Sequence, residues 1–152
     1  MQQTAKTRVE ARNIDTLLAK YGESHRNHTN ELIHFVCVPA IVFTLLGIVW
    51  WVHPLAAVAV SLAALWYYFQ LSRPFALGML VMTLLMLALL RALPPATVLP
   101  LSIAIFVLAW IGQLIGHKIE GKKPSFVDDL RYLLIGPLFV LSFLFRRLNI
   151  AY

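Results

Sequence analysis

Residues 32–72 read LIHFVCVPAIVFTLLGIVWWVHPLAAVAVSLAALWYYFQLS and contain no Asp, Glu, Lys or Arg. A membrane-spanning helix needs about 20 apolar residues, so this run is too long for one span and long enough for two. His53-Pro54 interrupts the run shortly after Trp50-Trp51 and marks a turn. The stretch therefore predicts two membrane spans, at residues 32–52 and 54–71, joined by a tight connection.

Two further apolar runs follow in the chain. Arg73 ends the second run, and residues 74–90 form a third run that stops at Arg91. Pro94 and Pro95 then indicate a turn, and residues 97–116 form the fourth run. We therefore expect the chain to cross a membrane four times.

Two shorter segments flank these spans. Residues 5–20 carry an imperfect apolar stripe and predict an amphipathic helix that lies on the membrane surface or packs over the bundle. Residues 132–145 are apolar over a length typical of a re-entrant or interfacial segment, with arginines on both sides. We expect a half-inserted C-terminal segment; the alternative is a fifth crossing, with the C-terminus outside.

The composition agrees with this architecture. Hydrophobic residues make up 60% of the chain and charged residues 13%, against roughly 45–50% and about 25% in soluble domains. The net charge is +6, and the basic residues lie at the ends of apolar runs, so positive-inside placement explains them better than nucleic-acid binding. We expect one all-α integral membrane domain over residues 1–152, with both termini and the 118–131 loop in the cytoplasm.

Several kinds of function have no support in the sequence. There is no Gly-rich phosphate loop, no GxSxG and no CxxC, which argues against nucleotide-dependent and nucleophile-elbow enzymes. Cys37 is the one cysteine, so no internal disulfide can form. The polar first 31 residues lack the apolar core of a signal peptide, so the first span is expected to act as an uncleaved anchor.

The predicted topology sorts the five histidines between the two membrane faces. His25, His28 and His34 lie at the start of the first span, and His117 lies at the end of the fourth. Four crossings place these two ends on the same face. His53 falls at the opposite face, roughly 30 Å away across the hydrocarbon core. The sequence therefore predicts a cluster of His25, His28, His34 and His117 at one end of the bundle.

Polar companions lie beside these histidines on the predicted helices. Asn30 and His34 are four residues apart, and Gln113, His117 and Glu120 are spaced by four and three, so each set shares one helix face. Imidazole nitrogens suit iron, zinc, copper and nickel. A ligating histidine usually needs an acceptor on its other nitrogen, and Asn30, Gln113 and Glu120 are candidates for this role. Alternatively, Glu120 could bind the metal ion directly.

The spacing of these residues resembles a known family, the membrane-embedded 2-hydroxy fatty acid dioxygenases of fatty-acid α-oxidation. The resemblance covers about residues 15–140. Two motifs carry it, Tyr21-x3-His25-x4-Asn30-x3-His34-x4-Pro39 and Gln113-x2-Gly116-His117-x2-Glu120-x3-Pro124. His28 is not part of this pattern.

The resemblance implies an iron(II) enzyme that shortens a long-chain 2-hydroxy fatty acid by one carbon with O2. Iron(II) would be the cofactor, held by the histidines, and the hydroxyl and carboxylate of the substrate would chelate it. The acyl tail would lie between the spans, lined by residues such as Phe35, Val38, Phe106 and Leu114. The location would be the inner membrane in a bacterium or the endoplasmic reticulum in a eukaryote, with membrane lipid as the surroundings.

Two other functions remain open on sequence alone. The same histidines could bind a structural metal or haem in a protein without catalytic activity, although no CxxCH haem-attachment motif is present. A small transporter fits less well, because transport sites usually lie near the bilayer midplane and these histidines lie at one end.

Overall fold

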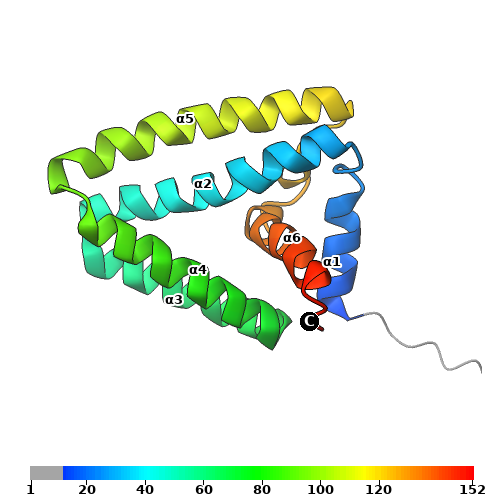
Figure 1. Cartoon of the computed structure of the whole chain (residues 1–152), viewed down its shortest axis with the longest axis horizontal. Helices are drawn as coiled ribbons and strands as arrows, with labels where there is room; N and C mark the ends of the chain where they lie inside the picture. Colours follow the sequence, from blue (N-terminus) through cyan, green and yellow to red (C-terminus); the bar gives the residue numbers. More distant parts are fainter. Residues whose placement is uncertain (1–11) are drawn as a thin grey trace, which may run out of the picture.

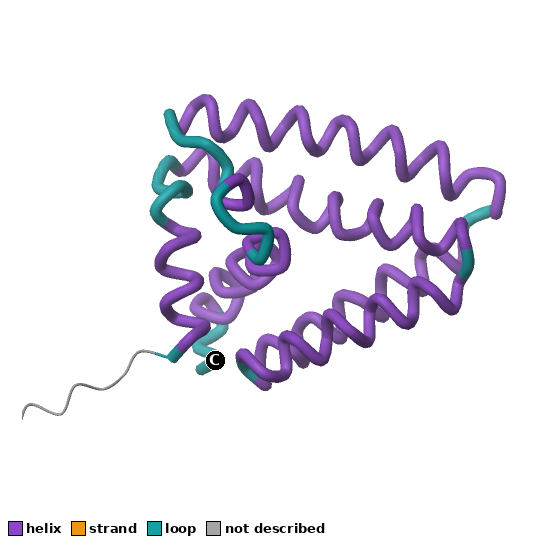
Figure 2. Tube along the Cα trace, turned by 180° about the vertical axis from the view of Figure 1, so that it is seen from behind, coloured by secondary structure: helices purple, strands orange, loops and turns teal. Residues whose placement is uncertain are grey.

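The computed structural model describes residues 12–152, and the helical elements follow the predicted runs (Figure 1). The bounds are α1 Asn13–Gly22, α2 His28–Val52, α3 Pro54–Leu71, α4 Arg73–Ala92, α5 Pro95–Glu120, the short 3-10 helix η1 Ser125–Val127 and α6 Tyr132–Arg147. Residues 12–152 contain no strand, as Figure 2 also shows. Within this part of the chain, α2, α3, α4 and α5 are long and apolar enough to cross a membrane. The all-α membrane architecture with four spans is therefore confirmed.

Helix α2 begins four residues before the apolar run. Asn27 precedes it, and its side-chain oxygen accepts a hydrogen bond from the backbone N–H of Thr29 at 2.9 Å. Such a cap satisfies a donor that the first helical turn leaves free, so the helix can begin with polar residues. The start of α2 is therefore set by the cap and lies ahead of the apolar run at residues 32–52.

Helix α5 likewise continues beyond its apolar run. It ends at Gly121, whose φ of 73° lies in the left-handed region that glycine adopts without a steric penalty. Helix α5 therefore extends one turn beyond the apolar run at residues 97–116. The added turn places both His117 and Glu120 on regular helix.

The spans form two antiparallel pairs that diverge from one end of the molecule (Figures 1 and 2). Helix α2 packs along α5, and α3 packs along α4. Helix α6 lies in the opening between the pairs and contacts α1, α2 and α4. Helix α1 runs crosswise at the open end, beside α6. The part of the predicted 5–20 helix before residue 12 lies outside the described residues.

Helix α6 is packed as a core helix. Its residues Ile135 and Leu138 are fully buried, and the Tyr68 hydroxyl of α3 donates a hydrogen bond to the Leu134 carbonyl at 3.0 Å. The largest buried cluster joins α6 to α1, α3 and α4; its members are Ile14, Leu17, Tyr21, Tyr68, Phe75, Ala76, Met79, Tyr132, Ile135, Leu138, Phe139 and Phe145. Helix α6 therefore holds the two pairs apart and closes the bundle at its open end.

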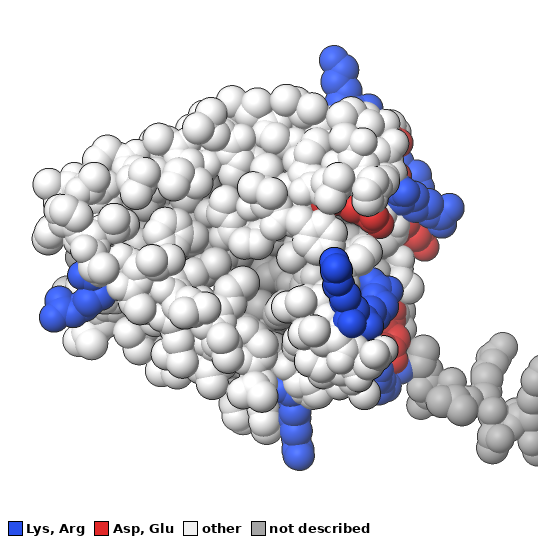
Figure 3. All heavy atoms as spheres, in the orientation of Figure 1, with Lys and Arg blue, Asp and Glu red and all other residues white. Residues whose placement is uncertain are grey.

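Charge is distributed unevenly over the surface. On the face shown in Figure 3, most charged side chains lie at the end where α1, the start of α2 and the end of α5 meet, and the rest of this face is mostly uncharged. Large apolar side chains point outward from the spans, with Val36 71%, Leu62 62%, Leu77 63% and Leu108 68% exposed. Such a surface is stable against lipid tails and unfavourable in water.

Candidate metal centre

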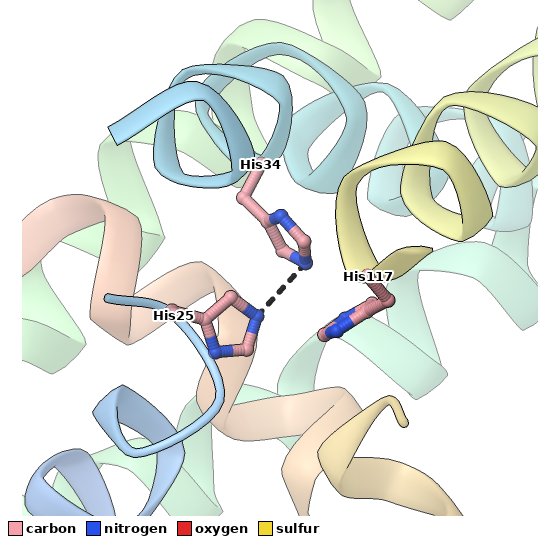
Figure 4. A group of neighbouring side chains, drawn as sticks. All are labelled: His25, His34 and His117. Carbon is pink, nitrogen blue, oxygen red and sulfur yellow. Dashed lines mark hydrogen bonds between the residues drawn. The ribbon is translucent and has the colours of Figure 1, made fainter. Parts of the chain in front are cut away.

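Three histidines from three segments meet at the charged end of the bundle (Figure 4). His25 comes from the turn between α1 and α2, His34 from α2 and His117 from α5. Their side chains are buried, and the ring centroids lie 4.2 Å apart for His25 and His34, 5.0 Å for His25 and His117, and 4.9 Å for His34 and His117. One ring nitrogen from each lies within 4.8 Å of the other two, so the three can reach a single ion.

Main-chain carbonyl groups determine how two of these rings are protonated. The Nδ1 of His25 lies 2.7 Å from the carbonyl oxygen of Tyr21, and the Nδ1 of His34 lies 2.8 Å from that of Asn30. A carbonyl oxygen only accepts hydrogen bonds, so each Nδ1 carries the proton and donates it. In the neutral rings, each Nε2 therefore presents a lone pair.

These two lone pairs face each other. The Nε2 atoms of His25 and His34 are 2.9 Å apart, the contact drawn as a dashed line in Figure 4. Two facing lone pairs at this distance repel unless a cation lies between them. Two nitrogens that each bind one metal ion at about 2.1 Å lie about 3 Å apart when they meet at a right angle. The donor set and its spacing therefore fit a first-row metal ion.

Burial favours the uncharged form of the His25 ring, which lies outside the membrane spans. Desolvation lowers the pKa of His25 to about 4, so this imidazole is neutral at physiological pH. The neutral ring is the form that binds a metal ion. Tyr21 stacks on the His25 ring with a centroid distance of 4.2 Å and an interplanar angle of 5°, which holds the ring in its orientation.

Glu120 holds the turn that carries His25. Its Oε1 accepts a hydrogen bond from the backbone N–H of Arg26 at 3.0 Å, and its Oε2 accepts from the backbone N–H of Asn27 at 2.8 Å and from Asn30 Nδ2 at 3.2 Å. Both carboxylate oxygens are therefore occupied by N–H donors at the start of α2. In this arrangement Glu120 ties the end of α5 to the turn beside the histidines.

Asn30 lies fully buried between the two helices that carry His34 and His117. Its Nδ2 donates to the Ser24 carbonyl at 3.1 Å as well as to Glu120, and its own carbonyl accepts from His34. Its Oδ1 finds no partner within the described residues and lies so close to Gly116 that a Cβ there would collide with it. The glycine therefore allows α5 to approach α2 at the level of the histidines.

A mainly apolar cavity of about 270 Å³ extends from the histidines into the bundle; we call it the apolar cavity. From His117 to Phe106 it follows α5 for eleven residues, or about 16 Å of helix. Its lining residues are Tyr21, Val38, Ile41, Val42, Leu45, Phe106, Trp110, Gln113, His117, Pro124, Ser125, Phe126, Tyr132, Leu133 and Gly136. Gln113 is buried and lines the cavity between His117 and Trp110, so a polar side chain lies between the histidine end and the apolar end.

Comparison with known proteins shows the family to which the chain belongs. The model of a family described as 2-hydroxy-palmitic acid dioxygenase Mpo1-like matches residues 11–148. The chain belongs to the Mpo1-like family. A curated relative, the 2-hydroxy-palmitic acid dioxygenase MPO1 of Saccharomyces cerevisiae (strain ATCC 204508 / S288c), is 31% identical over 137 residues, covering 85% of this chain and 78% of the relative. No solved structure matches the chain.

In this Mpo1-like chain, one predicted ligand lies away from the cluster. The side chain of His28 is 83% exposed, and its Nδ1 lies 3.8 Å from a carboxylate oxygen of Glu31. Because α2 begins at His28, residues 28 and 34 share one helix with a spacing of six, which turns them to different faces. The structure therefore does not bring His28 to His25, His34 and His117. His53 lies at the far end of α2, where it caps α3, as the topology predicted.

Two other sequence-based expectations for this member of the family were wrong in detail. The Nδ1 atoms of His25 and His34 donate to the carbonyls of Tyr21 and Asn30, so the side chains of Asn30 and Glu120 are not the acceptors for these two rings. Of the predicted tail-lining residues, Val38 and Phe106 line the apolar cavity. Phe35 instead packs on Phe143, and Leu114 is 57% exposed. Main-chain acceptors leave no signal in residue types, which is why sequence patterns missed them.

The segment after α5 also contributes to the site, which its polar composition did not indicate. Pro124, Ser125 and Phe126 line the apolar cavity, and the Phe126 ring packs edge to face on Trp110 with a centroid distance of 5.2 Å. The Oγ atoms of Ser125 and Ser24 are 2.7 Å apart, and Ser24 Oγ lies 3.2 Å from the Nδ1 of His25. The loop therefore covers the histidine end of the cavity.

Proposed function

We propose that the protein is a non-haem iron(II) dioxygenase that shortens long-chain 2-hydroxy fatty acids by one carbon within a membrane. The supporting observation is a group of three buried imidazoles whose nitrogens lie within 4.8 Å of one another, with His117 lining one end of the apolar cavity. The activity for which the yeast relative is named supports the substrate class. Dioxygen chemistry favours iron over zinc, which has no redox activity, and imidazole ligands suit iron.

The residues of this chain supply binding and orientation. The apolar cavity would take the acyl tail, so that the head group lies beside His117 and Gln113. His25, His34 and His117 would hold iron(II), which supplies O2 activation and binds the hydroxyl and carboxylate oxygens of the substrate. Glu120 and Asn30 would keep the His25 turn in place through their hydrogen bonds, and the loop around Phe126 would exclude bulk water.

The overall reaction balances without an added reductant. A 2-hydroxy acid and one O2 give the acid one carbon shorter, carbon dioxide and water. The bond between the carboxyl carbon and the hydroxyl-bearing carbon breaks, and the latter carbon becomes the new carboxyl group. The substrate itself therefore supplies the electrons that O2 accepts, and we expect one O2 to be consumed for each acid shortened.

The reaction is tested with purified protein loaded anaerobically with iron(II). After admission of air, we expect 2-hydroxypalmitate to yield pentadecanoate, measured by mass spectrometry, with O2 uptake followed by an electrode. Palmitate and 3-hydroxypalmitate should be poor substrates, because neither places a hydroxyl and a carboxylate in the same chelating position. A fully iron-loaded protein that shortens no 2-hydroxy acid would favour a metal-binding protein without catalytic activity.

For the membrane topology, we propose that both termini and the 118–131 loop face the cytoplasm. Basic residues gather at the end of the bundle that carries this loop, which is the arrangement the positive-inside rule predicts. Reporter fusions at Arg26, Lys123 and Tyr152 should give a cytoplasmic signal, and a fusion at His53 should give a signal from the opposite side. A cytoplasmic signal at His53 would contradict the four-span topology.

A further inference from the structure

A second cavity lies beside the apolar cavity at the charged end of the bundle; we call it the polar cavity. Its volume is about 340 Å³. The charged residues in its wall come from α1 and from the segment between α5 and α6; they are Lys20, Glu23, Lys122, Lys123 and Asp128. Three lysines face two carboxylates, so the wall carries an excess of positive charge.

The lysines differ in how they are paired. Lys123 Nζ lies 2.7 Å from a carboxylate oxygen of Asp128, which neutralises its charge. Lys122 Nζ donates to the main-chain carbonyl of Glu23 at 2.8 Å, and a carbonyl does not neutralise the ammonium. Within residues 12–152, Lys20 makes no hydrogen bond or ion pair through its side chain. The polar cavity can therefore attract an anion.

A thin partition separates the polar cavity from the histidines. Ser125 and Tyr132 line both cavities, and Ser24 lines the polar one. The Oγ atoms of Ser24 and Ser125 are 2.7 Å apart, and Ser24 Oγ also touches His25 Nδ1 at 3.2 Å. A pair of hydrogen-bonded hydroxyls therefore lies between the basic wall and the candidate metal centre.

This partition can open at little cost. A hydrogen bond between two neutral hydroxyls contributes little net free energy when water can replace each partner. The polar cavity offers such water on one side of the pair. If Ser24 and Ser125 separate, the two cavities join into one groove with a basic end and an apolar end.

We propose that the polar cavity is the port through which the carboxylate of a fatty acid reaches the histidines, and through which the shortened acid leaves. The identification of the ligand as a fatty acid rests on the proposed function. A fatty acid has a charged head and an apolar tail, and neither cavity alone suits both parts. Moving an ionised carboxylate through an apolar cavity would cost much desolvation energy. In the joined groove, the head is held beside Lys20 and Lys122 while the tail enters the apolar cavity, and the head then passes Ser24 and Ser125 to reach the histidines.

A disulfide between positions 24 and 125 tests whether the partition must open for the ligand to bind. In a Cys37→Ala background, Ser24→Cys and Ser125→Cys place two thiols where the hydroxyls are 2.7 Å apart, within reach of a disulfide. The association rate of palmitate with the full-length, iron-loaded protein is measured without O2, before and after reduction of the disulfide. We expect association to be about 10-fold slower in the oxidised form, because binding then lacks the required conformational change, and to recover on reduction. Equal rates in both forms would overturn the port.

The control is the single Ser24→Cys variant in the same background, carried through the same oxidation and reduction. It cannot form the disulfide, so its palmitate association rate should not change with redox treatment. Because palmitate binding needs neither O2 nor turnover, a protein that fails to shorten 2-hydroxypalmitate still gives a result here. Failure of the port and failure of the proposed reaction are thus separate outcomes.

A second measurement tests the charge and does not depend on the disulfide. Removing one unpaired ammonium by Lys20→Met should weaken palmitate binding about 5-fold, as expected for one nearby charge at the protein surface. Binding of hexadecanol, which has the same tail and no charge, should not change. Lys118→Met is the matched control, since Lys118 is exposed and does not line the polar cavity. An equal loss for the acid and the alcohol, or an equal loss in the control, would overturn the proposal.

Discussion

Replacing His25, His34 or His117 by alanine is expected to remove most of the iron from the purified protein. Each ring supplies one of three converging nitrogens, and the remaining two cannot hold the ion with useful affinity. Turnover of 2-hydroxypalmitate should fall by more than about 100-fold, since even changes to residues behind metal ligands cost 10–100-fold. Elemental analysis of the detergent-purified variants measures the metal directly, and the activity assay measures the consequence.

The chain contains two matched controls for this experiment. His28 is three residues from His25 and exposed, and His53 lies at the opposite end of α2. Alanine at either position should leave the iron content and turnover within about 2-fold of the unmodified protein, as is usual for surface substitutions. Equal metal content in the His28, His34 and His117 variants would show that the cluster is not the metal site.

The second large effect is expected at Glu120. Glutamine at this position keeps the shape of the side chain but replaces one acceptor oxygen by an NH2 group that faces N–H donors. The hydrogen bonds to Arg26, Asn27 and Asn30 cannot all survive, so the turn that carries His25 loses its anchor. We expect iron affinity to fall by about 10–100-fold, the usual effect of losing a group that orients a ligand. Competition with a chelator measures this affinity.

Glu31→Gln is the matched control, because Glu31 lies one turn into α2 and accepts none of these hydrogen bonds. Its iron affinity should be unchanged. A different result for the Glu120→Gln variant would assign the Glu120 carboxylate another role. If Glu120→Gln binds iron normally and loses turnover alone, the carboxylate takes part in the reaction itself and does not act by holding the turn.

The positions of the spans could be predicted from hydropathy, whereas the helix ends are set by capping groups that hydropathy does not report. Hydropathy reports where apolar side chains occur along the chain. A helix end depends on how its last backbone groups are satisfied, here by the Asn27 side chain at α2 and by the left-handed Gly121 at α5. These few residues matter for function, because the added turns hold Asn30, His117 and Glu120 in regular geometry.

The candidate site was only partly predictable for a related reason. The number of crossings sufficed to bring His34 and His117 to one end, and it brought His28 there as well. Which side chains then meet depends on the direction in which each leaves its helix, and His28 points away from His34. The two side chains diverge because residues six apart on one helix do not share a face.

Local signals in the chain settle the class of protein, the order of its spans and the end at which the histidines gather. They do so because hydropathy, charge and the number of crossings can be counted along the chain. Contacts between distant segments set the rest: the facing nitrogens of His25 and His34, the packing of α6 between the helix pairs, and the Ser24–Ser125 partition between two cavities. These features depend on side-chain direction and close packing in three dimensions, which spacing along the chain does not encode.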